Sequence, residues 1–168
     1  ERSGLKILDI GTGSGNIAIA LAKNLKDAKI TAIDKMPDAL KIAKQNAVAN
    51  CVNEGINFSL SDITEFNSDL GCDFDIVVSN PPYISKKEYP GLQPELVNYE
   101  PAQALTDYQD GLSFYRTISN KSKTLLKKGS KLYFEMGQGQ DKLIEEIMLN
   151  EGYTDILIKK DYQNINRV

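Results

Sequence analysis

Short apolar runs along the chain are separated by segments in which apolar residues recur at helical spacing. Four runs in the first half read as strands, at residues 5–10, 29–33, 56–60 and 74–79. They alternate only weakly between apolar and polar positions, which is typical of strands buried on both faces of a parallel sheet. Helices are expected after the first two strands, with one face formed by Ile17, Leu21 and Leu25 and another by Leu40, Ala43 and Ala47.

The second half of the sequence continues this alternation after one interruption. Residues 84–110 are polar and rich in Pro, Gly and Tyr, so we expect a long loop there, either a substrate wall or lid or a plain surface excursion. The pattern then predicts a helix with Phe114, Ile118 and Leu125, a strand at 131–135, a helix that ends at Gly152, and a sixth strand at 153–159. This order predicts an α/β fold with a doubly wound, mostly parallel sheet, whose ligands lie beyond the carboxyl ends of the strands.

The composition restricts the possible chemistry of the protein more than it restricts the fold. The 168 residues are 41% hydrophobic with a net charge of −3, which suits one domain with an adequate core and disfavours a nucleic-acid partner. No apolar run approaches the roughly 18 residues that a membrane span needs. The chain has no histidine, which excludes imidazole bases and nucleophile pairs, and its two cysteines are too far apart for a metal site. Without histidine, we expect no enzyme-derived titration near pH 6.5.

A glycine cluster lies where the first strand turns into the first helix. The sequence Asp9-Ile-Gly11-Thr12-Gly13-Ser-Gly15 allows a tight turn and a close approach of the backbone to a ligand. Its G-x-G-x-G spacing and preceding acid differ from the G-x-G-x-x-G dinucleotide fingerprint, which argues against a pyrophosphate on the helix N-terminus. A ligand with a positive centre would suit Asp9.

Two further acids follow the next two strands. Asp34 ends the second strand, where a carboxylate can accept hydrogen bonds from both ribose hydroxyls. Asp62 follows the third strand and can accept from an exocyclic amine such as that of adenine. Either acid could instead simply cap an element. Their positions after successive strands favour a shared ligand site.

The fourth strand ends in Ser79-Asn80-Pro81-Pro82-Tyr83. The two prolines remove two backbone donors and fix φ, which stiffens the segment. A planar NH2 group has two hydrogens to donate, and the Asn80 side-chain oxygen and the Pro81 carbonyl can accept one each. Tyr83 can pack its ring against the planar group. The motif therefore favours chemistry on an amide or aromatic amine nitrogen, in which positioning replaces a strong base. A rigid structural turn is the alternative.

Together these motifs resemble class I S-adenosylmethionine-dependent methyltransferases over essentially the whole chain. A closer resemblance, over residues 5–168, is to the HemK/PrmC family of release-factor glutamine N5-methyltransferases. It is carried by Ile7-Leu-Asp-Ile-Gly-Thr-Gly-Ser-Gly-Asn-Ile-Ala-Ile-Ala-Leu21, Val77-Val-Ser-Asn-Pro-Pro-Tyr-Ile84, Tyr99-Glu-Pro-Ala-Gln-Ala-Leu105, Asp110-Gly-Leu-Ser-Phe-Tyr115 and Phe134-Glu-Met-Gly137.

The resemblance implies a Rossmann-like class I methyltransferase fold and methylation of the glutamine in the Gly-Gly-Gln motif of class I peptide chain release factors. S-adenosylmethionine would be the cofactor, S-adenosylhomocysteine the product, and the cytoplasm the location. It implies catalytic roles for Asn80, Pro81 and Tyr83, with Pro82 joining them in substrate contact. The cofactor-binding positions it implies are Asp9, Gly11, Thr12, Gly13, Gly15, Asp34, Asp62, Ile63 and Asn80.

Residues 1–168 are expected to form one methyltransferase domain, without the family's N-terminal helical domain and last antiparallel strand. Three rival functions stay open on sequence alone. The first is methylation of an exocyclic amine of adenine or guanine in DNA or RNA, the second a non-catalytic cofactor-binding module, and the third an NAD-dependent oxidoreductase. Glu135, at the end of the predicted fifth strand, is either a site acid or a structural carboxylate.

Overall fold

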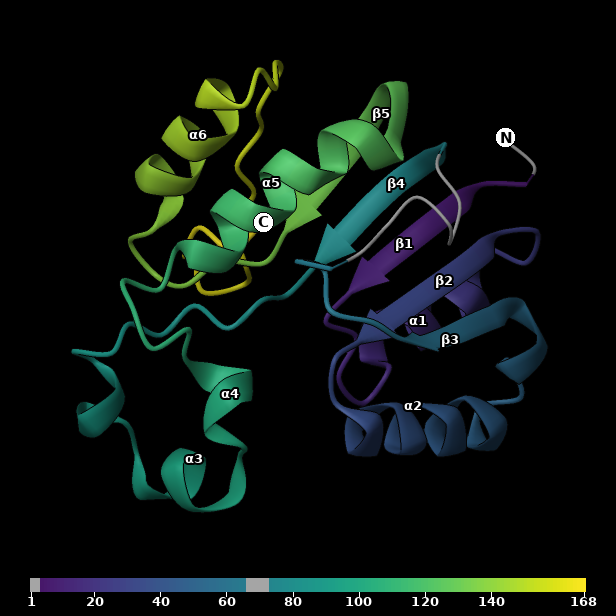
Figure 1. Ribbon diagram of the computed structural model, residues 1–168, viewed down its shortest axis with the longest axis horizontal. Coiled ribbons are helices and arrows are strands. Elements are labelled where there is room, and N and C mark those ends of the chain that lie inside the picture. The colour runs from purple at the N-terminus through teal and green to yellow at the C-terminus, as the bar shows by residue number, and fades with distance from the viewer. Residues whose placement is uncertain (1–3, 66–72) are drawn as a thin grey trace. The chain divides into compact units, whose positions relative to one another are not determined.

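A parallel sheet organises the part of the chain that the computed structural model describes, residues 4–65 and 73–168 (Figure 1). Its five strands lie in the order β3-β2-β1-β4-β5. Their bounds are Lys6–Ile10 for β1, Lys29–Asp34 for β2, Ile56–Leu60 for β3, Phe74–Ser79 for β4 and Leu126–Phe134 for β5. β1 pairs in parallel with both β2 and β4, and β2 pairs in parallel with β3. The predicted doubly wound α/β fold is confirmed.

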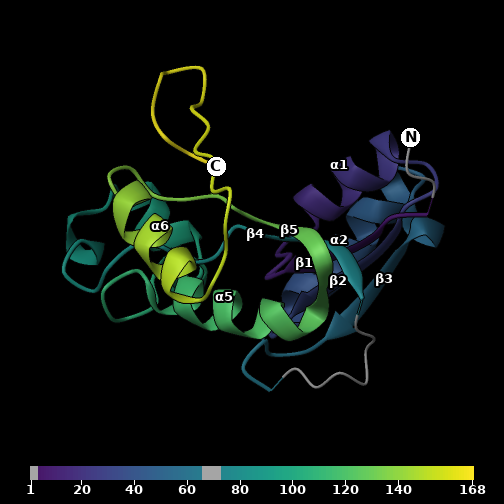
Figure 2. The ribbon, with the colours of Figure 1, turned by 90° about the horizontal axis from the view of Figure 1, so that it is seen from above.

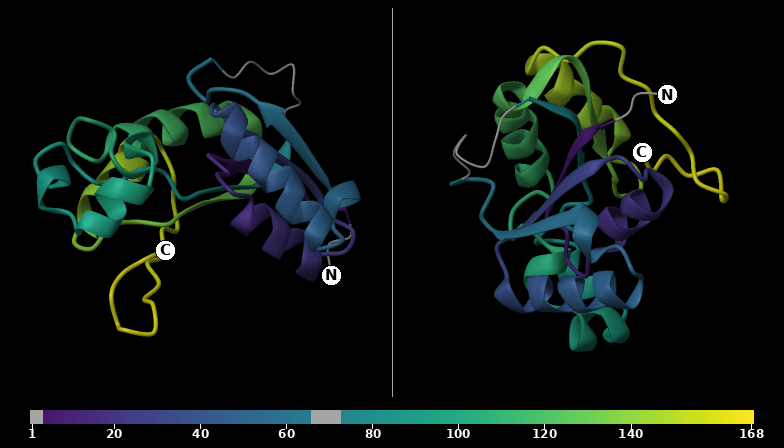
Figure 3. Two further views of the ribbon diagram at one scale, coloured as in Figure 1. Left: turned by 90° about the horizontal axis from the view of Figure 1, so that it is seen from below. Right: turned by 90° about the vertical axis from the view of Figure 1, so that its right-hand side faces the viewer.

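Helices α1 (Asn16–Asn24) and α2 (Pro37–Ala49) connect the first three strands. The two helices lie side by side (Figure 3) and contact each other as well as β2 and β3. Both crossovers step the same way along the sheet, and right-handed crossovers then bring both helices to one face. Residues from these helices and strands form one buried cluster: Ile7, Ala18, Ile19, Ile30, Ala32, Ala47 and Ile56. This cluster fixes the positions of the loops that leave β1 and β2.

The described residues divide into two compact units. The first comprises the chain up to Asn80 together with Lys121–Tyr133, and the second comprises Pro81–Asn120 and Phe134–Val168. Helix α5 (Ser113–Leu125) passes from the second unit to the first. The change of unit between Asn80 and Pro81 falls inside the Asn-Pro-Pro-Tyr motif.

The second unit has its own packing centre. Tyr115 of α5 is fully buried, its ring meets that of Phe134 edge-on at 5.1 Å between centroids, and its hydroxyl donates to the Glu135 carbonyl. Helix α6 (Asp141–Asn150) follows β5, and the Tyr153 hydroxyl after it donates to the Ser119 carbonyl. Figure 2 shows α6 of this unit together with the C-terminal segment in yellow.

Two expectations for this half of the chain are corrected. Residues 153–159 form no strand, because Asp155 has φ 55°, Leu157 is 77% exposed, and Lys159 bonds instead to Arg167 and Val168 as the segment folds back on itself. Residues 84–110 are not a plain loop, since they hold η3 (Tyr89–Gly91), α3 (Pro94–Tyr99) and α4 (Ala102–Leu105). These helices are too short to produce a helical period in the sequence. The fifth strand is confirmed but begins earlier, at Leu126.

The ends of β1 and β4 are joined by a buried hydrogen bond, in which the Ser79 hydroxyl donates to the Ile10 carbonyl at 2.8 Å. Ser79→Ala should lower the free energy of unfolding by about 1 kcal/mol, because it removes a buried donor and leaves the acceptor less satisfied. Urea denaturation of the full chain measures this difference. An unchanged denaturation midpoint would show that the bond does not stabilise the strand ends.

Candidate functional site

The sheet order brings four polar positions of the first unit to one edge. Asp9 lies in β1, Asp34 ends β2, and Asp62 and Asn80 follow β3 and β4. In the parallel register Ile10 lies opposite Ser79, so the glycine loop after β1 and Asn80 after β4 begin at the same level of the sheet. Asp34 is likewise paired with Leu60 of β3. The sequence-predicted cluster of strand-end residues is therefore formed by the pairing itself.

The glycine loop adopts a conformation that glycine makes accessible. Gly11, Gly13 and Gly15 have φ of 68°, 57° and 87°, in the left-handed region that L side chains rarely adopt. A Cβ added to Gly11 or Gly13 would meet nothing within 4 Å, whereas one on Gly15 would lie 3.1 Å from the Cβ of Ala43 in α2. The first two glycines thus leave open space along the loop, and the third permits close packing of two helices.

The loop is tied to β2 at both main chain and side chain. The N–H groups of Gly11 and Thr12 donate to the Ile33 carbonyl at 2.9 and 3.0 Å. The Gly13 N–H donates to Asp34 Oδ2 at 2.8 Å, and Met36 N–H donates to Asp34 Oδ1 at 2.9 Å. Each carboxylate oxygen of Asp34 keeps acceptor capacity beyond these single bonds. Asp34 therefore both braces the loop and retains the ability to accept ligand hydroxyls.

Asp9 is a fully buried carboxylate with one oxygen unpaired. Its Oδ2 accepts from the Thr12 hydroxyl at 2.6 Å, while its Oδ1 has no hydrogen-bond partner among the described residues. Burial raises the pKa of Asp9 to about 6, against the opposing effects of Thr12 and of the Ala18 N–H in the first turn of α1. A buried unpaired acceptor is costly, so the site suits a ligand that brings a donor or a positive charge.

This pKa corrects one expectation from composition. The absence of histidine predicted no enzyme-derived titration near pH 6.5, yet a buried carboxyl group with a pKa of about 6 titrates close to that value. Desolvation moved an acid into the range that histidine usually occupies.

Asp62 and Ile63 lie just after β3. Asp62 is partly exposed, and its Oδ1 accepts from the Thr64 N–H and hydroxyl, both at 2.9 Å. Its other oxygen accepts no hydrogen bond from the residues that the structure describes. The Ile63 side chain is 5% exposed and belongs to the buried residues. One carboxylate oxygen of Asp62 thus forms a local cap with Thr64, in agreement with the capping interpretation.

The Asn-Pro-Pro-Tyr motif spans the change from the first unit to the second. Asn80 is exposed, and its side chain makes no hydrogen bond within the described part of the chain. In the second unit Pro81 is buried, while Pro82 and Tyr83 are partly buried. An exposed side-chain amide with no internal partner, next to a buried proline, has donors and acceptors available for a ligand.

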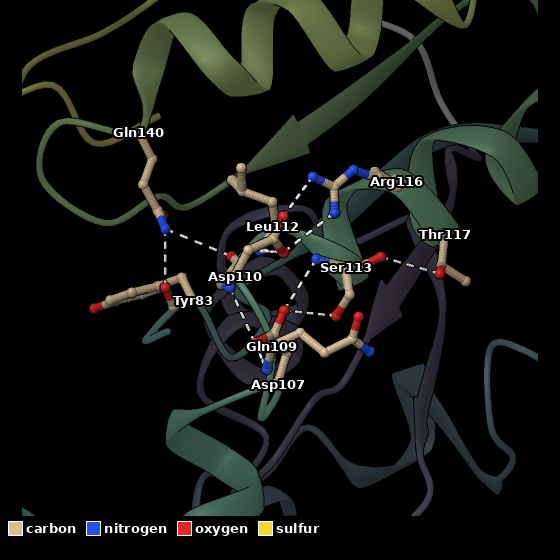
Figure 4. A network of polar contacts seen from close by, with 10 residues as sticks. Tyr83, Asp107, Gln109, Asp110, Leu112, Ser113, Arg116, Thr117 and Gln140 are labelled. Atoms are coloured by element: carbon tan, nitrogen blue, oxygen red, sulfur yellow. Dashed lines mark hydrogen bonds and ion pairs between the residues drawn. The ribbon is translucent and has the colours of Figure 1, made fainter. Parts of the chain in front are cut away.

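Sequence reasoning missed the residues that hold Tyr83. The Gln140 side chain donates to the Tyr83 carbonyl at 2.9 Å (Figure 4). Gly111 and Gly137 pack closely beside this contact. The motif Phe134-Glu-Met-Gly137 ends three residues before Gln140, so it gave no signal for this residue. The main-chain carbonyl of Glu135 accepts the Tyr115 hydroxyl.

Neither a metal site nor a membrane-spanning helix is found in residues 4–65 and 73–168. No group of three or more His, Cys, Asp or Glu side chains there could hold a metal ion. The helices of the same residues are all too short or too polar to cross a bilayer.

The fold defines a Rossmann-like α/β protein with a glycine loop at the carboxyl edge of a parallel sheet. A family model described as a methyltransferase domain matches residues 1–167, and the chain belongs to that family. Solved structures agree on the fold: a methyltransferase from Pyrococcus furiosus superposes with a TM-score of 0.69 at 20% identity, covering 99% of this chain and 73% of that one.

Curated relatives extend the similarity to sequence. A release factor glutamine methyltransferase from Fusobacterium nucleatum is 44% identical over 162 residues, which are 96% of this chain and 45% of that protein. A protein of the same name from Thermodesulfovibrio yellowstonii is 40% identical over 168 residues, 100% of this chain and 59% of that protein. The chain spans about half the length of these relatives. The resemblance that the motifs indicated is thereby confirmed.

Replacing the Asp9 carboxylate tests its energetic cost. The carboxyl group of Asp9 has its ordinary pKa of 3.8 in the unfolded chain and a pKa of about 6 in the folded chain, so it destabilises the folded state increasingly as pH rises between these values. Asp9→Asn should therefore raise the free energy of unfolding by about 1 to 3 kcal/mol at pH 7. The gain should vanish below about pH 3, where the carboxyl group is protonated in both states. Denaturation at several pH values measures the gain, and a pH-independent difference would contradict the assigned pKa.

Proposed function

We propose that this chain is the methyltransferase domain of a protein-glutamine N5-methyltransferase, which methylates the glutamine of the Gly-Gly-Gln motif in a class I peptide chain release factor. The observation that carries the proposal is the Asn80-Pro81-Pro82-Tyr83 motif, which follows β4 where that strand pairs with β1 and its glycine loop. Relatives at 38–44% identity that carry the name release factor glutamine methyltransferase support the substrate. The two units would form one domain over residues 1–168, in a cytoplasmic enzyme.

The residues at the sheet edge fit S-adenosylmethionine. The open space at Gly11 and Gly13 accommodates a ligand against the backbone, with Thr12 and Gly15 shaping the loop. The unpaired Oδ1 of Asp9 matches the positively charged methionine end, Asp34 retains acceptor capacity for ribose hydroxyls, and Asp62 has a free oxygen for the adenine amine. Ile63 would provide apolar contact for the adenine ring. The polar groups of the site thus complement the successive parts of the cofactor.

The chain itself would supply orientation. S-adenosylmethionine, when bound, supplies an electrophilic methyl group on a sulfonium centre, and S-adenosylhomocysteine is left as product. The Asn80 side-chain oxygen and the Pro81 carbonyl each accept one hydrogen of the substrate amide, which turns the nitrogen lone pair out of conjugation. Tyr83 and Pro82 pack against the planar group. Such positioning contributes as much as ~7 to 11 kcal/mol to lowering a barrier.

The protein need not provide a strong base. Methyl transfer to the neutral amide leaves a cationic nitrogen that still carries both hydrogens. This cation is strongly acidic and releases one proton to solvent, so two fixed acceptors suffice. This agrees with a chain that contains no histidine. The same four residues suit an exocyclic amine of adenine or guanine, but the net charge of −3 and the names of the relatives favour the protein substrate.

The substrate class is tested by competition. Labelled S-adenosylmethionine is supplied with a class I release factor, DNA and RNA in one mixture. We expect label in the release factor alone. Label confined to nucleic acid would overturn the proposal in favour of the exocyclic-amine alternative, and absence of transfer to any of the three would favour a non-catalytic cofactor-binding module.

Cofactor affinity should depend on the charge of Asp9. Its pKa of about 6 means that roughly one tenth of the free protein carries this negative charge at pH 5, so the affinity for S-adenosylmethionine should fall about tenfold between pH 7 and pH 5. Titration calorimetry measures this fall. Asp9→Asn should bind more weakly at pH 7 and show little pH dependence over the same range. An identical slope in both proteins would exclude Asp9 as the titrating group.

Asn80→Ala should strongly reduce turnover and leave the affinity for S-adenosylmethionine almost unchanged. The substitution removes one of the two acceptors for the substrate amide, which costs about 1 to 3 kcal/mol for the lost partner and more through lost orientation. We expect kcat to fall at least a hundredfold while the Kd for S-adenosylmethionine changes by less than about threefold. An activity loss that follows cofactor affinity in proportion would instead assign Asn80 to cofactor binding.

A further inference from the structure

Gln140 joins three segments of the second unit that are far apart in the sequence. Its Nε2 donates to the Tyr83 carbonyl at 2.9 Å (Figure 4) and lies 3.5 Å from the Gly111 carbonyl. Its Oε1 accepts the Gly137 N–H at 3.1 Å. Both ends of the side-chain amide are therefore used. The amide sits directly before α6, which begins at Asp141.

The peptide group between Tyr83 and Ile84 is held from both sides. Its carbonyl oxygen receives the Gln140 bond, and its N–H donates to the Leu105 carbonyl at 3.0 Å. A peptide plane with both polar groups bonded to separate elements cannot rotate without breaking one of them. Tyr83 follows two prolines of fixed φ, so its position also restrains the segment that precedes it.

Glycines make this contact close. A Cβ on Gly111 would collide with the Tyr83 carbonyl oxygen, and a Cβ on Gly137 would lie 2.9 Å from Cδ2 of the Tyr83 ring and 2.8 Å from Gln140 Oε1. Gly111 also has φ of 79°, which favours glycine. The absence of side chains at both positions lets Gln140 and Tyr83 pack against the main chain.

A buried carboxylate holds the loop that presents Gly111. Asp107 accepts the N–H groups of Gly111 and Ser113, both at 3.0 Å, and the Ser113 hydroxyl at 2.7 Å. Burial alone would raise the pKa of Asp107, but these bonds, with that of Gln109, lower it below its usual value. Figure 4 shows the neighbouring Asp110 paired with Arg116, at 2.6 Å between Oδ2 and Nη2. The side of the contact facing Gln140 is thus a firmly fixed loop.

We propose that Gln140 is a positioning residue, whose side-chain amide holds the Tyr83 carbonyl and so fixes the Pro81–Tyr83 half of the substrate-binding motif. Gln140 would touch neither cofactor nor transferred methyl group. It acts through Tyr83, and its catalytic consequence rests on the proposed function. The hydrogen bonds to Tyr83 and Gly137 give the side chain a definite direction, because the donor end must face Tyr83 and the acceptor end Gly137.

Gln140→Glu tests the donor end of this amide separately from its acceptor end. The variant keeps the shape and the acceptor for the Gly137 N–H, but it places a carboxylate oxygen against the Tyr83 carbonyl. Gln140→Met removes both polar ends at similar length. Gln163→Glu is the matched control, since Gln163 is exposed in the C-terminal segment. Circular dichroism and thermal denaturation of the full chain establish that each variant folds.

The first readout is hydrogen exchange of the segment around Ile84, which needs no activity. We expect faster exchange at Ile84 in both Gln140 variants, unchanged exchange in β1, and wild-type behaviour in the control. The second readout is turnover with a release factor. We expect kcat to fall about 10- to 100-fold with a less than threefold change in Kd for S-adenosylmethionine, because small displacements of a positioning motif cost about that much.

The pH dependence of kcat distinguishes loss of the hydrogen-bond donor from a general loss of structure around the motif. Protonation restores an O–H donor to Gln140→Glu, so the kcat of this variant relative to wild type should rise as pH falls, whereas the ratio for Gln140→Met should stay flat. Wild-type exchange at Ile84 in both variants, or faster exchange with wild-type kcat, would overturn the proposal. If the wild type methylates no release factor, the proposed function fails, and the exchange experiment alone then decides whether Gln140 holds Tyr83.

Discussion

Parallel pairing of β1 with both β2 and β4 is the constraint on which the site depends. Parallel strands end at a common edge, so the residues that follow them meet although they are far apart in sequence. The register sets Ile10 against Ser79, and the Ser79 hydroxyl bonds the Ile10 carbonyl, which ties together the glycine loop and Asn80. Any shift of this register by one residue would turn the strand-end side chains to the other face.

The carboxyl edge of the sheet buries a charged group at a free-energy cost that no contact within the described residues offsets. Asp9 is fully buried with an unpaired oxygen, and burial raises its pKa to about 6. A carboxylate kept in this state lowers stability at neutral pH and gains most when a cation arrives. The glycine loop follows the same pattern, since Gly11 and Gly13, both in the left-handed region, keep space open beside the backbone. This edge of the sheet thus lowers the stability of the folded chain, which is common at functional sites.

The sequence was sufficient where the signal is local. The ends of β2, β3 and β4 could be predicted because apolar runs stop at polar or turn-forming residues, and the glycine loop and Asn80-Pro-Pro-Tyr motif are contiguous. It was insufficient where partners are distant. The Gln140 contact needs residues 83, 111 and 137 in one place, and the pKa of Asp9 needs the burial that only the folded chain gives. The expected strand at 153–159 failed because apolar residues alone do not supply a pairing edge.

The central claim is that the Asn-Pro-Pro-Tyr motif directs methyl transfer to a glutamine amide of a protein. Tandem mass spectrometry of a class I release factor incubated with the chain and S-adenosylmethionine tests it most directly. The account predicts one added methyl group, located on the glutamine of the Gly-Gly-Gln motif. A methyl group on any other residue, or an unmodified release factor beside methylated nucleic acid, would contradict it.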